Sequence, residues 1–159
     1  MIGNDIVDLK LAHQESNWQR KGFLAKLFTA HEQQLILSSC TPESMVWNLW
    51  SRKEAAYKIY NRLSGQRVFN PKSFECMDNK VCFYNTIFYT QTQVTSDFVY
   101  TIAATCTSNF DTIQHQTSRN EIHKIKGIPH FFDDRNSLFL PASISHHGRF
   151  IRVAVLSLY

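Results

Sequence analysis

Two groups of polar residues near the start of the chain have types and spacings that could do chemistry. Asp5 lies in a short run of otherwise apolar or small residues. It is either a surface aspartate at a strand end or a carboxylate that meets a cation, because burying an unpaired charge is costly. Glu54 and Lys58 stand one helical turn apart, with Trp47 and Trp50 on the same side of the predicted helix. They form either a solvated surface pair or, since two tryptophans favour partial burial, a pair that holds a metal-phosphate assembly.

A third polar group lies near the C-terminus, in the segment Ser-Ile-Ser-His-His-Gly-Arg over residues 143–149. It offers hydroxyls, imidazoles and a guanidinium beside a glycine. Such groups bind phosphate when they cluster. Taken alone, the same composition is equally typical of a polar turn between two strands.

The elements that must position these groups divide the chain near residue 61. Alternation predicts a strand over residues 2–7, and a short helix is expected over 18–27. Thr29 and Glu32 have the spacing of a capping box that opens the next helix. Thr-Pro at positions 41 and 42 is typical of a helix start, and a long helix is expected from there to about residue 63.

The second part of the chain is rich in β-branched and aromatic residues, which favour strands. A helix is expected over residues 118–126, closed by Gly127. The predicted class is α+β in a single domain, with an antiparallel sheet packed against the long helix. Strands are expected over residues 73–76, 80–89, 98–105, 141–145 and 150–158.

Composition limits the classes of protein that this chain can be. At 159 residues, with 43% hydrophobic and 13% aromatic side chains, it can bury one substantial core. A net charge of +4 suits an acidic partner or a phosphate-rich ligand but falls short of a nucleic-acid binder. No apolar run approaches the roughly 20 residues of a membrane span. Four cysteines without Cys-x-x-Cys spacing predict reduced thiols in a cytoplasmic protein rather than a zinc site.

Together these segments resemble the 4′-phosphopantetheinyl transferase superfamily, and most closely its short, holo-acyl-carrier-protein-synthase type. Residues 1–9, MIGNDIVDL, are similar to the opening strand Gly-x-Asp-Ile-Val-Glu of that type. Residues 23–29, followed by Glu32, are similar to the segment before its second helix. Residues 50–58 match its signature of an aromatic residue, two residues, Lys-Glu-Ala and a lysine four beyond the glutamate. Residues 143–150 are similar to its Ser-x-Ser-His segment near the C-terminus.

The resemblance implies transfer of 4′-phosphopantetheine from coenzyme A to a serine of a carrier protein, with release of adenosine 3′,5′-bisphosphate. Asp5 and Glu54 are the implied ligands of Mg²⁺, or of Mn²⁺. Val7 stands where the long type has a third carboxylate, so more metal positions are left to water and phosphate. Lys58 is expected to reach a phosphate oxygen. The proton of the carrier serine passes either to Glu54 or to a water on the metal.

The resemblance also implies residues that contact the rest of coenzyme A. Ser145 and His146 are candidates for its 3′-phosphate or for closing the site. Lys53 points elsewhere from the helix than Glu54 does, and it is assigned to the nucleotide. The glycine-rich stretch that often follows the signature helix is reduced here to residues 64–66.

The positive charge of the first helices is expected to dock an acidic acyl or peptidyl carrier protein. Such contacts raise the association rate more than the affinity. A homo-oligomer is expected, a trimer first, with a loosely matched insertion at about residues 80–135. The alternative function is a non-catalytic coenzyme A-binding or accessory module beside a synthase. The presence of both implied metal ligands, Asp5 and Glu54, favours the enzyme. The predicted docking cations are Lys10, Arg20, Lys21 and Lys26.

Overall fold

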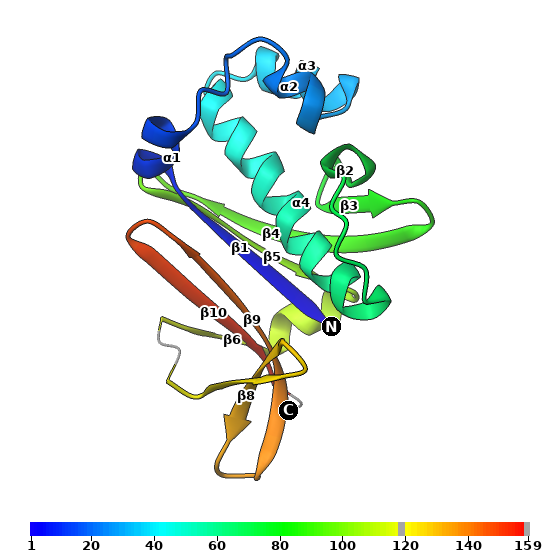
Figure 1. Cartoon of the computed structure of the whole chain (residues 1–159), viewed down its shortest axis with the longest axis vertical. Helices are drawn as coiled ribbons and strands as arrows, with labels where there is room; N and C mark the ends of the chain where they lie inside the picture. Colours follow the sequence, from blue (N-terminus) through cyan, green and yellow to red (C-terminus); the bar gives the residue numbers. More distant parts are fainter. Residues whose placement is uncertain (118–119, 158–159) are drawn as a thin grey trace.

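Two antiparallel sheets and one long helix organise the chain, whose computed structural model describes residues 1–117 and 120–157 (Figure 1). The helices are α1 (Leu9–Glu15), α2 (Phe23–Leu27), α3 (Ala30–Ser38) and α4 (Pro42–Ser64). The first sheet has the order β1 (Ile2–Asp8), β5 (Phe98–Ala104), β4 (Thr86–Val94), β3 (Lys80–Phe83) and β2 (Glu75–Met77). The second has the order β6 (Ile113–Gln116), β10 (Phe150–Leu156), β9 (Leu138–His147), β8 (Ile128–Asp133) and β7 (Ile122–Ile125).

Helix α4 lies across one face of the first sheet, and α2 and α3 gather at its N-terminal end (Figure 1). Strand β1 approaches this helix very closely. A Cβ added to Gly3 would stand 2.1 Å from the carbonyl oxygen of Ala55, so only glycine fits there. The core between helix and sheet contains Val46, Leu49, Ala56 and Ile59 from α4, and Val81, Phe88, Val99 and Ala103 from the strands.

The second sheet is attached to the first along the outer edge of β1. There the side chains of three alternate residues of β9 accept hydrogen bonds from three alternate backbone N–H groups of β1. Each bond joins residues 139 positions apart, so β9 runs parallel to β1, and side chains replace the usual backbone ladder. The bonds run from Asn4 to Ser143 Oγ at 3.0 Å, from Ile6 to Ser145 Oγ at 3.0 Å and from Asp8 to His147 Nδ1 at 2.9 Å.

The structure confirms the α+β class and several predicted elements. The first strand, the strand over 98–104 and the long helix lie where the sequence places them. Thr29 and Glu32 form both bonds of the predicted capping box. The expected strand over 80–89 is two strands, β3 and β4, because Tyr84 takes a positive φ of 49° and turns the chain.

Two predicted helices are corrected. The helix expected over 18–27 is present only as α2, and α1, which was not predicted, precedes it. The helix expected over 118–126 is wrong: β7 pairs with β8 there, while residues 118 and 119 lie outside the described residues. Lys126 and Gly127 have φ values of 50° and 80°, which two-residue hairpin turns require. Within the described chain, no helix is both long and apolar enough to cross a membrane.

Candidate active site

A pocket of about 330 Å³ lies where β1, α1, α2, α4 and β9 meet. Its walls combine elements far apart in sequence. Trp47 and Trp50 of α4 give it an apolar side, and Asp5 and Glu54 give it two carboxylates. The helical spacing that placed the two tryptophans beside Glu54 is therefore confirmed.

Asp5 faces this pocket from the middle of β1 and is almost completely buried. Burial raises the pKa of its carboxyl group, and the positive charge of Lys58 and a hydrogen bond from Ser145 partly oppose that rise. Ser145 Oγ donates to Asp5 Oδ1 at 3.0 Å while it accepts the N–H of Ile6. The orientation of Asp5 thus depends on a hydroxyl from the second sheet.

Glu54 reaches the same pocket from α4 and is half-buried. Desolvation, followed by the negative charge of Asp5, raises its pKa to about 7. An effect of one carboxylate on the other requires that they lie close together. The strand and the helix therefore bring together the two acids that the sequence assigned to one site.

Lys58 lies one turn beyond Glu54, against the backbone of β1. Its Nζ donates to Asn4 O at 2.6 Å and lies 3.4 Å from Asp5 Oδ1. These contacts use two of its three N–H donors. Its side chain is 27% exposed, so the third donor is accessible to a ligand bound beside Asp5.

The two carboxylates suit a hard divalent cation. Asp5 and Glu54 repel each other while both are partly desolvated, and a cation between them would relieve that repulsion. Nowhere in residues 1–117 and 120–157 do three or more His, Cys, Asp or Glu side chains form a potential metal cluster. Two carboxylates with open positions match Mg²⁺, which keeps waters and substrate phosphates as its remaining ligands.

The segment of β9 beside this pocket divides its residues between two faces. Ser143, Ser145 and His147 face β1, since each accepts one of its N–H groups. His146, which the sequence assigned to coenzyme A, is exposed and lies on the pocket lining together with His147. The sequence placed Ser143 and His147 in the third polar group but assigned them no role, although counting in twos from Ser145 would have put both on the face toward β1.

A clamp closes the end of β1 next to the pocket. Arg149 holds Asp8 through Nε and a terminal nitrogen, both at 2.9 Å, and these bonds keep the pKa of Asp8 well below its usual range. Asp8 also caps α1 by accepting the N–H of Lys10 at 3.1 Å. A Cβ on Gly148 would meet Asp8 Oδ2 at 2.5 Å, so glycine is required at this turn.

Lys53 does not reach the pocket, and the structure does not support its assignment to the nucleotide. Its side chain is fully buried, and its Nζ contacts three oxygen atoms: Glu32 Oε2 at 2.7 Å, Pro71 O at 2.9 Å and Phe74 O at 2.6 Å. All three donors of the ammonium group are thereby used. Lys53 joins α4 to α3 and to the loop before β2.

The predicted docking cations lie on segments that form one side of the pocket. Lys10 is on α1 and Lys26 on α2, and both are exposed. Arg20 and Lys21 are exposed in the turn before α2, with the Arg20 guanidinium 5.6 Å from the ring centre of Phe23. Because Phe23 lines the pocket, this basic surface adjoins the pocket.

Comparisons with known proteins identify a family and a similar fold. The family model described as the 4′-phosphopantetheinyl transferase superfamily matches residues 1–107. A search of curated proteins gives no match. Among solved structures, apo-ACPS of Chronobacterium ammoniagenes is similar at 13% identity and a TM-score of 0.53, over 65% of this chain and 93% of that one. Its complex with CoA is similar at 13% identity and 0.51, over 64% and 93%. These likenesses concern the fold.

Proposed function

The chain belongs to the 4′-phosphopantetheinyl transferase superfamily, and on that premise we propose that it transfers 4′-phosphopantetheine from coenzyme A to a serine of an acyl or peptidyl carrier protein. The observation that carries the proposal is the meeting of Asp5 and Glu54 in one pocket, with Lys58 beside them. A related fold, the ACPS of Chronobacterium ammoniagenes, is described in complex with CoA. This supports coenzyme A as the donor substrate here.

In the proposed reaction, the serine oxygen of the carrier attacks the phosphorus next to the pantetheine arm. The bond from that phosphorus to the bridging oxygen breaks, and adenosine 3′,5′-bisphosphate leaves. Asp5 and Glu54 would hold Mg²⁺, which neutralises negative charge on the pyrophosphate. Lys58 donates its remaining N–H to a phosphate oxygen. Glu54 lines the same pocket, and it is the carboxylate that we assign to accept the serine proton.

The second sheet keeps these groups in place without supplying a carboxylate. Ser145 fixes Asp5, and His147 fixes the end of β1. His146 is exposed on the pocket lining, and we assign it to the nucleotide end of coenzyme A. Such fixed alignment matters because phosphoryl transfer depends mainly on positioning and charge stabilisation.

The test is direct incubation of the protein with coenzyme A, Mg²⁺ and a panel of apo-carrier proteins. We expect one carrier to gain about 340 Da, the mass of the covalent arm, and expect chelation of the metal to prevent it. Asp5→Asn should shift the metal titration to higher concentration. A non-catalytic coenzyme A-binding module would bind the substrate but modify none of the carriers.

We also propose that the basic surface docks the carrier. Reversing charge at Arg20 and Lys21 to glutamate should slow modification of the carrier and leave coenzyme A affinity unchanged, with a smaller effect at high salt. If the rate with carrier does not change, docking uses another surface. We still predict a homo-oligomer, most simply a trimer. Light scattering on the purified protein measures its molar mass and so tests this prediction.

A further inference from the structure

A second pocket, called here the inter-sheet pocket, lies between the two sheets and apart from the candidate active site. Its volume is about 500 Å³, within the range of small-molecule sites. Strands β4 and β5 line it from one side, and β6 and β10 from the other. Its lining includes Arg152 and His115 together with hydroxyl and amide groups, and none of the described lining residues is acidic.

Arg152 offers the inter-sheet pocket an orientated cation without a counterion. Its guanidinium lies 5.2 Å, 5.9 Å and 6.0 Å from the ring centres of Phe98, Tyr100 and Phe150. These rings fix the orientation of its plane. One terminal nitrogen donates to Ile151 O at 3.0 Å. Within the part of the chain that the structure describes, no carboxylate forms an ion pair with it.

His115 offers the same pocket a neutral donor. Tyr100 Oη is 3.4 Å from Asn4 Nδ2, whose N–H it accepts, and 3.5 Å from His115 Nδ1. In the tautomer that carries the imidazole proton on Nε2, Nδ1 accepts the phenol proton of Tyr100. Burial and the charge of Arg152 lower the pKa of His115 and keep the ring neutral. Its Nε2–H is then available to an acceptor in the pocket.

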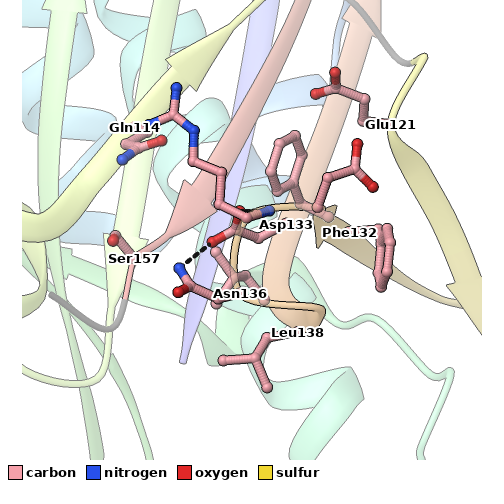
Figure 2. Close-up of a pocket in the computed structure, with 11 residues that line it drawn as sticks. Gln114, Glu121, Phe132, Asp133, Asn136, Leu138 and Ser157 are labelled. Atoms are coloured by element: carbon pink, nitrogen blue, oxygen red, sulfur yellow. Dashed lines mark hydrogen bonds between the residues drawn. The ribbon is translucent and has the colours of Figure 1, made fainter.

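The hollow in Figure 2 shows the opposite chemistry at a similar volume, about 450 Å³. Glu121, Asp133 and Asp134 line it near the turn between β8 and β9. Asp133 is already occupied, because it accepts the backbone N–H of Arg135 at 3.0 Å and Asn136 Nδ2 at 2.8 Å. Three carboxylates outnumber the single cation of this hollow, Arg135, so an anion would be repelled there, whereas the inter-sheet pocket attracts one.

We propose that the inter-sheet pocket binds the phosphate group of a small phosphate monoester, with Arg152 and His115 as its donors. A guanidinium gives phosphate two parallel charge-assisted hydrogen bonds, and Nε2–H of the imidazole adds a third. The amides of Gln91 and Gln93, also on the lining, can bind polar groups on the remainder of the molecule. This site is independent of the proposed transfer reaction.

The test is calorimetric titration of the full chain, without metal, with inorganic phosphate and separately with adenosine 5′-monophosphate. Arg152→Gln should weaken binding of both at least about tenfold, because charge-assisted bonds are lost. Arg135→Gln removes the same charge from the hollow in Figure 2 and should leave both affinities unchanged. Equal affinity for the two probes means that the phosphate alone is held, and tighter binding of the nucleotide means that its other groups contribute.

A second variant keeps the proposal testable if Arg152→Gln does not fold. His115 is exposed, so His115→Gln should keep the fold and weaken phosphate binding a few-fold. The proposal fails if wild-type protein shows no saturable binding, or if both pocket variants bind like wild type. It also fails if Lys58→Gln abolishes binding while Arg152→Gln does not, since the phosphate would then lie in the candidate active site.

Discussion

The two sheets differ in what they bury and in what they give to the candidate active site. Every residue of β1 is buried in the first sheet, whereas β7 in the second has three exposed residues out of four. The first sheet and α4 supply the charged groups Asp5, Glu54 and Lys58. The second supplies a neutral hydroxyl and imidazoles, from Ser145, His146 and His147. In the proposed function, the first sheet with α4 would carry the chemistry, and the second sheet would set its alignment.

The family match follows the same division, because it covers residues 1–107 and ends before the second sheet begins at β6. The residues that align Asp5 nevertheless come from β9, outside the matched range. The expected insertion over about 80–135 stays a prediction. Its first part forms β3, β4 and β5 of the first sheet, and its last part forms β7 and β8.

The largest effect on stability is expected in the first region, from Lys53→Met. This change leaves Glu32 as an unpaired charge in the core, and loss of one partner from a buried ion pair costs about 3–5 kcal/mol. Urea unfolding measures the loss. Lys72→Met makes the same change at an exposed position and should alter the free energy of unfolding by less than about 0.5 kcal/mol. Similar losses in the two variants would contradict the structural role of Lys53.

The largest effect on activity is expected from Glu54→Gln, which should lower the transfer rate about a hundredfold to a thousandfold. A neutral amide can neither hold Mg²⁺ as a carboxylate does nor accept the serine proton. The fold should persist, since repulsion with Asp5 is relieved. Glu43→Gln on the same helix, where the acid pairs with His13 at 3.0 Å, is the control and should keep normal turnover. Near-normal turnover of Glu54→Gln with Mg²⁺ would remove this residue from the mechanism.

The sequence predicts the first region better than the second for a physical reason. Helix α4 has local signals, a proline at its start and apolar residues at helical spacing. Asp5 follows from one motif, and Glu54 and Lys58 follow from another. Strand β7 has four residues, and only its pairing with β8 distinguishes it from a helix. Lys53 was misplaced because its partner Glu32 lies 21 positions away, and sequence spacing on one helix does not reveal such a contact.

A moderate effect on stability is expected from Asp8→Asn, because Asp8 and Arg149 join the two sheets. The amide loses the charge-assisted bonds to Arg149, which should destabilise the fold less than loss of a buried pair, because the Arg149 side chain is 48% exposed. Because the folded state holds the pKa of Asp8 below its ordinary 3.8, this stability is present above that pH and is lost as pH falls below it. Unfolding measured between pH 7 and pH 2 should show a weaker acid dependence in the variant. If the variant lost stability at low pH as steeply as the wild type, the pair of Asp8 and Arg149 would not hold the two sheets together in solution.

The smallest effect separates alignment from simple attachment, through Ser145→Ala and Ser143→Ala. Both serines accept an N–H group of β1, but only Ser145 also donates to Asp5. Each hydrogen bond lost should cost about 1 kcal/mol of stability, so Ser145→Ala, which loses two, should be the less stable variant. Only Ser145→Ala should also affect transfer, because Asp5 loses the donor that orientates it. The Mg²⁺ concentration needed for half-maximal transfer should rise and turnover should fall, and the two effects combined should amount to about tenfold. Equal activity in the two variants would show that the second sheet only attaches to β1, and that Asp5 needs no alignment from it.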